Sequence, residues 1–313
     1  MIKKTFDVAV ILINFNSSKY SINCIQSIIK HTTKDISYQI IVIDNCSEKD
    51  DFLELQEFCN HSDFPDLTLF RSKRNSGFGG GNMQGVQFAN AKYLAFINND
   101  TTLCNDCFSI LMQEVEKNPT IGVATAQAYK EDGEFLISID HFASLTREIL
   151  GRDFLELIDK HRYPKRHKLY SELTKAEFVS GAFMFLRTTD FYEAGGFDTN
   201  IFLYYEETDL CKRLLKKHKY AYLVPMAKYI HVHGASTSTT KSLLIKKELK
   251  ISLLYVIKKH YGTLPYFILL SFLTTKYLFT SIVKPQYWSF FVLMLSGASL
   301  SKSLKQQQKI SNL

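Results

Sequence analysis

The chain has 313 residues, which is long enough for one large α/β domain with an appendage or for two domains. Its composition, 46% hydrophobic and 22% charged with no low-complexity block or evident repeat, is that of a globular protein. The net charge of +7 is uneven: residues 241–313 hold eleven lysines and one acid, Glu248, and carry +10, whereas the remainder carries −3. A basic, apolar tail favours an anionic membrane surface as partner and argues against nucleic acid.

The six cysteines show no disulfide framework. Cys104 and Cys107 form a single CxxC without the second pair of a zinc site, so we interpret it as incidental. The first apolar run, residues 8–13, is too short for a secretory signal. We therefore expect a cytoplasmic protein with reduced thiols.

The first hundred residues alternate between apolar runs and helical patterns. Helices are expected from Ser17 or Ser18, from residues 48–51 and from a glycine-rich loop at 74–82, and the buried strands are expected at residues 7–14, 38–44, 67–70 and 93–97. This order predicts an α/β fold with a mostly parallel central sheet flanked by helices. Ligands gather at the carboxyl ends of such strands.

Two features at these strand ends suggest chemistry. Asp100 follows the strand at 93–97, either as part of a simple Asn-Asp turn or where Mg²⁺ or Mn²⁺ would join it to a diphosphate. The glycine loop has Asn82 where a dinucleotide fingerprint has its last glycine, and it follows the third strand, not the first. A nicotinamide-dependent dehydrogenase is therefore disfavoured, and a loop that approaches a nucleotide sugar remains open.

The second half is less regular. A helix is expected at 106–117, strands at 122–128, 178–187 and 220–224, and a helix start at 188–192. Ser180 and Gly181 interrupt the strand at 178–187, where another group can approach the backbone. Residues 129–175 show little pattern, and their basic patch at 161–168 is either a solvated loop or the lining of a groove for an anionic acceptor.

Three carboxylates, Glu206, Glu207 and Asp209, stand at the head of a basic helix. Acids there commonly complement the helix dipole, but like charges so close together also raise one another's pKa, which suits a general base. Further on, His231 and His233 lie two residues apart and face one side of an extended segment, either as metal ligands or as surface histidines.

Taken in order, four separated segments resemble glycosyltransferase family 2, which has the GT-A fold, and most of all its bacterial rhamnosyltransferase-like branch. The segments are residues 10–16 (VILINFN), 40–47 (IIVIDNCS), 75–82 with 93–101 (NSGFGGGN, YLAFINNDT), and 180–236. The resemblance implies inverting transfer of a sugar from a nucleotide-diphosphate donor, such as dTDP-rhamnose or a UDP-sugar. The acceptor it implies is a lipid-linked saccharide in the synthesis of O-antigen, capsule or cell wall.

The resemblance also implies site residues. Asp100 matches the last position of the family's metal-binding Asp-x-Asp motif, and the first position of that motif is Asn98 here. His231 is expected to close the site around Mg²⁺ or Mn²⁺, and His233 is the less favoured choice. Glu207 takes the place of the family's general base. Residues expected to support the base or bind the acceptor are Gly181, Glu206, Asp209 and His233. Residues expected along the nucleotide sugar are Asn16, Asp44, Asn75, Gly79, Gly80, Asn82 and Asn99.

We expect a glycosyltransferase domain at residues 1–240 and a helical tail at 241–313. Residues 264–283 contain one charge, Lys276, and 287–300 are again apolar. Such a tail has three possible arrangements: helices lying in the membrane interface, which we favour, a re-entrant or spanning hairpin, or helices packed on the body. The first places the protein peripherally on the cytoplasmic face of the inner membrane.

Two rival functions follow from the same residues. A catalytically inactive GT-A-fold binding or scaffold protein would explain Asn98 and the replacement of the family's base by Glu207. Against it, Asp100, His231 and the acids at 206–209 are retained, and an inactive site does not need them. The position of the glycine loop argues against the other rival, a nicotinamide-dependent oxidoreductase.

Overall fold

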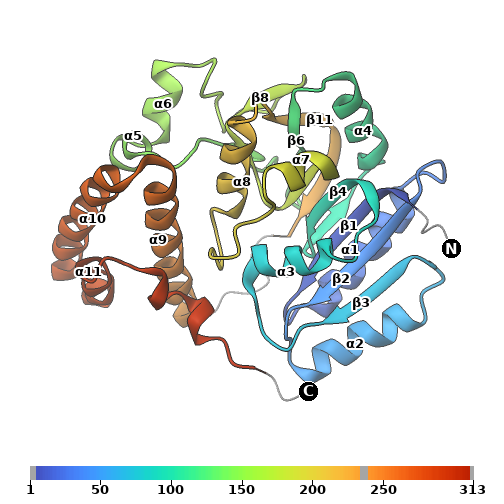
Figure 1. Cartoon of the computed structure of the whole chain (residues 1–313), viewed down its shortest axis with the longest axis horizontal. Coiled ribbons are helices and arrows are strands. Elements are labelled where there is room, and N and C mark those ends of the chain that lie inside the picture. The colour runs from blue at the N-terminus through green and yellow to red at the C-terminus, as the bar shows by residue number, and fades with distance from the viewer. Residues whose placement is uncertain (1–4, 233–238, 311–313) are drawn as a thin grey trace.

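The computed structural model describes residues 5–232 and 239–310. Its centre is a nine-stranded mixed sheet with the order β3-β2-β1-β4-β10-β6-β11-β5, and β8 pairs with β11 beside this path (Figure 1). Its strands are β1 (Phe6–Asn14), β2 (Tyr38–Asp44), β3 (Leu67–Arg71), β4 (Ala91–Asn98), β5 (Thr101–Leu103), β6 (Ile121–Tyr129), β8 (Thr174–Ala176), β10 (Phe183–Arg187) and β11 (Tyr220–His231). A two-stranded sheet joins β7 (Ile139–Asp140) to β9 (Phe178–Val179).

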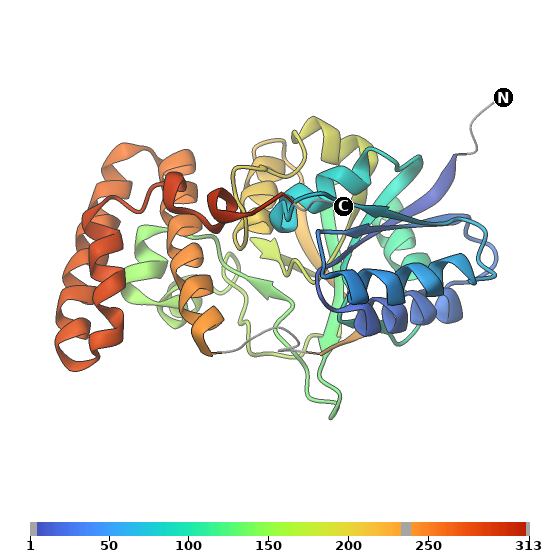
Figure 2. The same ribbon diagram turned by 90° about the horizontal axis from the view of Figure 1, so that it is seen from below.

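Helices cover both faces of the sheet and form a separate layer at one end of the molecule (Figures 1 and 2). The helices around the sheet are α1 (Ser18–His31), α2 (Lys49–Asn60), α3 (Gly77–Val86), α4 (Cys107–Lys117), α5 (Leu145–Leu150), α6 (Arg152–Ile158), α7 (Thr188–Glu193) and α8 (Glu206–Leu215). The end layer contains α9 (Thr239–Tyr261), α10 (Thr263–Val283), α11 (Trp288–Leu295) and the 3₁₀ turns η1 (Pro285–Tyr287), η2 (Leu300–Lys302) and η3 (Leu304–Gln307).

The central strands are apolar on both sides because helices cover both faces. In β1, Val10 and Leu12 face a core shared with α1, α2 and α4, whereas Ala9 and Ile11 face a core shared with α3, α7 and α8. The expected α/β architecture with a flanked central sheet is confirmed. Strands β3, β2, β1 and β4 are parallel, but β10 runs antiparallel between β4 and β6, so the whole sheet is mixed.

Strand β11 extends well past the segment 220–224 expected from the sequence. Pro225 lacks an N–H, and pairing with β6 shifts register between Val224 and Lys228 before it resumes. The strand therefore continues to His231, which pairs with Thr101 of β5. This continuation brings His231 next to the residues that follow β4.

The first tail helix packs on the body. Its buried residues do not form one narrow stripe: Ile251, Ser252, Leu253, Leu254, Val256 and Ile257 are all buried. Ser252 Oγ donates to the carbonyl oxygen of Leu203 at 2.9 Å, and Lys259 Nζ lies 2.7 Å from Asp198 Oδ2. Of the three arrangements considered for the tail, α9 therefore adopts the one packed on the body and not the favoured interfacial one.

Helix α10 is different, because much of its apolar surface is exposed. Phe267, Phe279, Ile282 and Val283 are among the exposed side chains of this helix. Among the described residues, α10 alone is long and apolar enough to cross a membrane. One such helix is weak evidence for a span, and α10 packs on α9, α11 and α5 in a shared apolar cluster.

Candidate active site

The carboxyl ends of β1, β2 and β4 lie side by side at one edge of the sheet. Asn14 of β1 is in register with Asp44 of β2, and β4 ends beside them at Asn98. Asn99 Nδ2 donates to the hydroxyl of Ser17, just past β1, at 2.7 Å. The structure thus gathers the strand-end residues expected along a nucleotide.

Asp44 forms the floor of this edge and is fully buried. Its Oδ1 accepts a hydrogen bond from Asn14 Nδ2 at 3.0 Å, its Oδ2 accepts one from the Ser47 N–H at 3.3 Å, and Arg71 Nε lies 3.4 Å from Oδ2. Asn16, by contrast, is exposed. Asn16 therefore lies at the surface of the site, whereas Asp44 is buried below that surface.

Asn45, which our sequence analysis missed, ties down the glycine loop. Its Nδ2 donates to Asn75 Oδ1 at 3.0 Å and to the Gly77 carbonyl at 3.1 Å, and its Oδ1 accepts from the Ser76 N–H at 3.0 Å. Gly77 has φ +76°, and a Cβ there would lie 2.0 Å from the carbonyl oxygen of Phe202. The loop is therefore fixed on both sides, and the signal for Asn45 was its position directly after Asp44.

The remaining glycines of the loop allow close packing. A Cβ on Gly79 would lie 3.4 Å from Glu206 Cγ, and one on Gly80 would lie 2.8 Å from Ser76 Cβ. Asn82 is buried, and its amide donates within α3. Helix α3 can thus start close to the head of α8.

Asp100, just after β4, meets His231, the last residue of β11. Asp100 Oδ1 lies 3.0 Å from His231 Nε2, and the Val232 N–H donates to the Asp100 carbonyl at 2.9 Å. Their side chains are 21% and 11% exposed. His233, the alternative ligand, lies outside the described residues.

A carboxylate oxygen and an imidazole nitrogen so close together fit a divalent cation. No group of three or more His, Cys, Asp or Glu side chains suited to a metal occurs in residues 5–232 and 239–310. Mg²⁺ commonly uses one or two protein ligands and completes its shell with water and substrate phosphates. The pair therefore fits an ion shared with a diphosphate better than a closed structural site.

The adjacent acids Glu206 and Glu207 have different surroundings. Glu206 is 1% exposed, and burial, together with the charge of Glu207, raises its pKa well above the ordinary value. Burial also raises the pKa of Glu207 to about 7, and the charge of Asp140 acts in the same direction. Glu207 has the pKa of a base that works near neutral pH.

A pocket of about 230 Å³ contains Glu207. It also includes Asp140, Arg147, Arg152, Ser180 and Tyr204 in its lining. Thr208 lines the same pocket, and its hydroxyl is buried without a hydrogen-bond partner in the described chain. Gly181 lies next to Glu207: a Cβ on Gly181 would be 3.9 Å from Glu207 Oε2.

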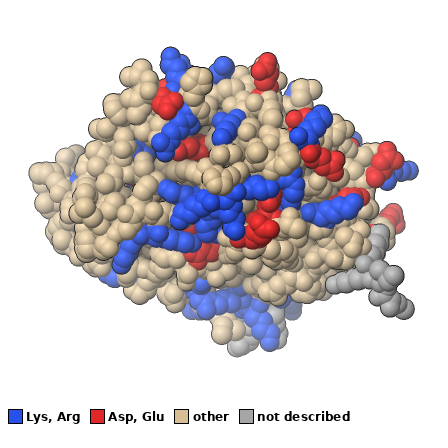
Figure 3. All heavy atoms as spheres, turned by 45° about the horizontal axis from the view of Figure 1, so that its top comes forward, with Lys and Arg blue, Asp and Glu red and all other residues tan. Residues whose placement is uncertain are grey.

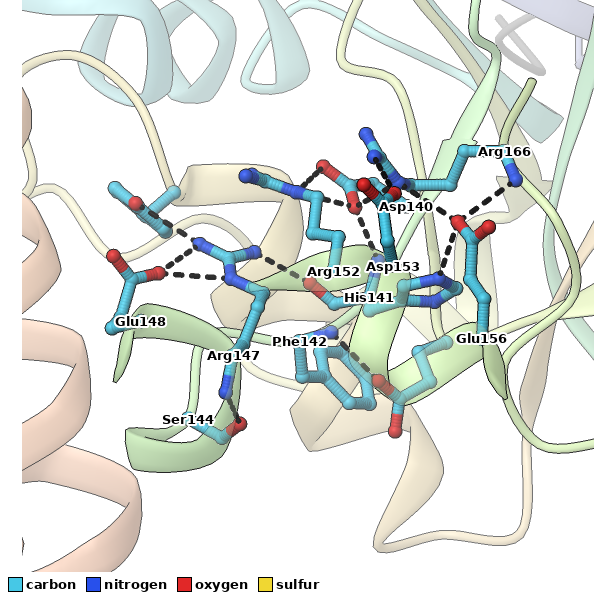
Figure 4. Close-up of polar contacts among 12 residues, drawn as sticks. Asp140, His141, Phe142, Ser144, Arg147, Glu148, Arg152, Asp153, Glu156 and Arg166 are labelled. Atoms are coloured by element: carbon cyan, nitrogen blue, oxygen red, sulfur yellow. Dashed lines mark hydrogen bonds and ion pairs between the residues drawn. The ribbon is translucent and has the colours of Figure 1, made fainter. Parts of the chain in front are cut away.

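An ionic network from the poorly patterned segment 129–175 is shown in Figure 4, and three of its members, Asp140, Arg147 and Arg152, line this pocket. Arg152 Nε lies 2.9 Å from Asp140 Oδ1, and Arg166 Nε lies 3.1 Å from Glu156 Oε1. Arg147 donates to Glu148 from Nε at 2.9 Å. Sequence reasoning missed these residues, because long-range ion pairs leave no periodic signal.

The chain reaches Glu207 through an unusual backbone. Tyr204 and Tyr205 have φ values of 69° and 73°, a left-handed conformation that costs about 1–2 kcal/mol for a residue with a Cβ. The hydroxyl of Tyr205 accepts a hydrogen bond from Arg147 Nη2 at 3.2 Å. The wall of the pocket thereby holds the turn that presents Glu207.

Asp209 lies on the other side of α8 and faces the tail. Its Oδ1 lies 2.7 Å from His260 Nε2 and 2.6 Å from Lys259 Nζ, and its Oδ2 lies 2.7 Å from Arg213 Nη2. Burial opposes its ionisation, but these cationic and hydrogen-bonding partners prevail and hold its pKa well below the ordinary value. Asp209 thus joins α8 to α9 and does not line the pocket of Glu207, where we expected it to support the base or the acceptor.

The glycine loop lies close to the residues around Glu207 at two points. Gly79 abuts Glu206, and a Cβ on Gly181 would lie 3.7 Å from the ring of Phe78 in the glycine loop. The start of α3 therefore adjoins both Glu206 and Gly181.

The sequence model described as "Glycosyl transferase family 2" matches residues 9–195. The chain belongs to glycosyltransferase family 2. Among curated family relatives, the rhamnosyltransferase WbbL of Escherichia coli K12 is 29% identical over 234 residues, which cover 72% of this chain and 84% of WbbL. The hexosyltransferase Agl10 of low-salt glycan biosynthesis in Haloferax volcanii is 23% identical over 68% of this chain and 62% of Agl10.

Solved structures place this family 2 chain in the GT-A fold. GalNAc-T7 with UDP, GalNAc and Mn²⁺ superposes with a TM-score of 0.60 at 15% identity, over 82% of this chain and 48% of that chain. The mannosyltransferase PcManGT of Pyrobaculum calidifontis with GDP-Man and Mn²⁺ gives 0.55 at 13% identity, over 96% of this chain and 88% of that chain. At these identities the likeness concerns the fold.

Proposed function

We propose that the chain is an inverting glycosyltransferase that moves a sugar, with rhamnose favoured, from a nucleotide-diphosphate donor to a lipid-linked saccharide. The observation that carries the proposal is Glu207, a carboxylate with a pKa of about 7 that lines a pocket beside the glycine loop. Similarity to WbbL over most of both chains supports rhamnose, with dTDP-rhamnose or a UDP-sugar as donor.

Glu207 acts as general base. Its carboxylate takes the proton of the acceptor hydroxyl while that oxygen attacks the anomeric carbon from the face opposite the leaving diphosphate. Such a base contributes roughly 10²–10⁴ in rate. Glu206 is buried beside Glu207 with its pKa raised well above the ordinary value, and Gly181 has no side chain where a Cβ would lie 3.9 Å from Glu207 Oε2.

The donor lies along the ends of β1, β2 and β4. Asn16, Asn75, Asn99 and the glycine loop line its path, and Asp44 braces the floor under its nucleoside. Asp100 and His231 would hold Mg²⁺ or Mn²⁺, and a bound ion would supply positive charge to offset the charge that develops on the departing diphosphate.

The acceptor is a saccharide on a lipid carrier, used at the cytoplasmic face of the inner membrane in the synthesis of surface polysaccharide. The exposed apolar surface of α10 supports this location, since a bilayer would cover it.

A donor panel tests the proposal. Purified protein with Mn²⁺ or Mg²⁺ is given dTDP-rhamnose, UDP-hexoses and GDP-sugars, and the released nucleoside diphosphate is measured with and without a bacterial membrane-lipid extract. We expect release from one donor, more with the extract and none from Asp100→Ala. Binding of nucleotide without release from any donor would contradict the proposal and favour the inactive scaffold.

A further inference from the structure

The surface from α6 to β8 combines exposed apolar side chains with a basic groove. Leu157 and Ile158, at the end of α6, are 74% and 56% exposed. The groove follows directly in the chain, at residues 160–175, and has a volume of about 620 Å³. Its basic lining residues are Lys160, His161, Lys165, Lys168 and Lys175.

The charge of this groove is not compensated by acids. Within residues 5–232 and 239–310, no carboxylate lies within ion-pair distance of Lys160, Lys165, Lys168 or Lys175. Lys168 and Lys175 lie instead over the rings of tyrosines, at 5.1 and 3.2 Å from the ring centroids. Figure 3 shows Lys and Arg side chains gathered across the middle of one face, with Asp and Glu side chains at their margins, beside a largely uncharged surface at the left. The groove is thus built to meet an anion.

The segment that contains α6 adjoins the tail through α5. Leu145 of α5 packs in the apolar cluster of α9, α10 and α11, and α5 contacts both α10 and α6 (Figures 1 and 2). Helix α10 exposes Phe267 and Ile268, and the preceding α5 exposes Ile149 and Leu150. One end of the molecule therefore presents apolar side chains from both the tail and the segment 145–158.

We propose that an anionic lipid bilayer docks on this surface, with Leu157 and Ile158 in the interface and the lysines of the groove on lipid phosphates. The inference rests on the proposed function, in which the acceptor is lipid-linked. Apolar side chains beside unpaired lysines favour a bilayer over a soluble polyanion, because a soluble polyanion has nothing to bury against exposed leucine and isoleucine.

Docking at α6 would place the pocket of Glu207 close to the membrane. Arg152, at the start of α6, lines that pocket, while Leu155 and Glu156 are buried against the body. The exposed residues Leu157 and Ile158 end the same two-turn helix. A saccharide attached to lipid would thereby reach Glu207 without leaving the surface.

Vesicle binding by the full-length chain tests this docking surface. Co-sedimentation is compared between vesicles of phosphatidylcholine alone and of phosphatidylcholine with phosphatidylglycerol. The test variants are K160E/K165E and L157Q/I158Q. The matched control is K30E/K34E, which makes the same charge change with exposed lysines at α1, on the far side from α10 (Figure 2). Thermal melting shows that each variant is folded.

We expect the wild type and K30E/K34E to bind the anionic vesicles equally. K160E/K165E should bind about tenfold or more weakly, because each lysine near an anionic surface contributes substantially to binding. L157Q/I158Q should also bind more weakly. Trp288, the single tryptophan, is 56% exposed on α11, so its emission reports the contact of the tail separately.

Equal vesicle binding by K160E/K165E and K30E/K34E would overturn the inference, and so would equal binding of the wild type to both vesicle types. A third contrary result is loss of transfer to a water-soluble saccharide by K160E/K165E with vesicle binding intact, which would assign the groove to the acceptor. Vesicle binding needs neither donor nor acceptor. Its failure therefore leaves the proposed transfer standing, and failure of the donor panel leaves the docking result standing.

Discussion

Glu206 packs against Gly79, and Glu207, the next residue, lines an open pocket. Burial and the charge of Glu207 raise the pKa of Glu206 well above its ordinary value, whereas burial raises the pKa of Glu207 to about 7. Two chemically identical neighbours thus have different surroundings, and each can be tested with the same substitution.

Glu207→Gln should leave donor binding nearly unchanged and lower transfer by roughly 10²–10⁴, because the base is lost. Glu206→Gln is the matched control: Glu206 is not among the residues that line the pocket, so transfer should stay within a fewfold of wild type. Steady-state transfer and thermal shift with nucleoside diphosphate measure the two effects. Wild-type turnover in Glu207→Gln would remove Glu207 from the mechanism.

The rate of transfer should rise with pH and level off above about pH 7. The base works in its ionised form, and burial raises the pKa of Glu207 to about 7. The profile of kcat/KM between pH 5 and 9 measures this dependence. A rate that is already constant from pH 5 upward would contradict a base with a raised pKa.

The proposed metal site should respond to substitutions at Asp100 and at Asn98, two residues earlier. Asp100→Ala should abolish stimulation by Mn²⁺, because it removes the carboxylate beside His231. Asn98→Asp should lower the Mn²⁺ concentration needed for half-maximal activity, because it adds an oxygen ligand of the kind such ions prefer. Metal titrations of donor turnover test both. Unchanged metal dependence in Asp100→Ala would place the ion elsewhere.

Gly77→Ala should destabilise the fold by about 2–5 kcal/mol. Its Cβ would meet the carbonyl oxygen of Phe202 at 2.0 Å, and φ is +76°. Gly133→Ala separates the two causes, because Gly133 has φ +88° but no atom within 4 Å of its Cβ. In urea unfolding, the free energy of unfolding of Gly133→Ala should be only about 1–2 kcal/mol below that of the wild type. Equal losses would show that the contact with Phe202 is unimportant.

Asp209→Ala should destabilise the protein by about 3–5 kcal/mol, because it leaves the charges of Arg213 and Lys259 without their buried partner. Since the folded pKa of Asp209 is depressed, its contribution is present above the ordinary pKa of an aspartate and is lost as pH falls below it. The difference in the free energy of unfolding between Asp209→Ala and the wild type should therefore become smaller at acidic pH. Asp153→Ala, at a side chain 94% exposed, is the control and should change little.

The sheet of the first hundred residues was predictable because its strands are buried on both faces. Such strands are continuous apolar runs, and β1, β2 and β4 appear where the runs are. The antiparallel insertion of β10 was not predictable, since strand order depends on packing between residues far apart. The continuation of β11 was not predicted because Pro225 suggests that the strand ends there. Proline lacks the N–H that would donate a hydrogen bond to the neighbouring strand, but pairing with β6 resumes at Lys228.

The candidate site shows the same division. Asp100 and His231 are 131 residues apart, and the family resemblance placed them in one site, where their side chains are in contact. Asp209 shares a helix turn with Glu207, but residues two apart on a helix point to different sides, and only the tertiary structure shows which side the tail occupies. Arg147 and Arg152 were not predicted as site residues, because their interaction partners depend on the tertiary structure.

The residues proposed to hold the donor lie between 16 and 100, apart from His231, and those lining the pocket of Glu207 lie between 137 and 249. The two stretches come together at the start of α3, where the glycine loop lies beside Glu206 and Gly181. Under the proposed function, donor choice and acceptor choice are therefore encoded in different stretches of the gene. Exchange of the second stretch between homologues would then change the acceptor or the linkage while the nucleotide sugar is kept.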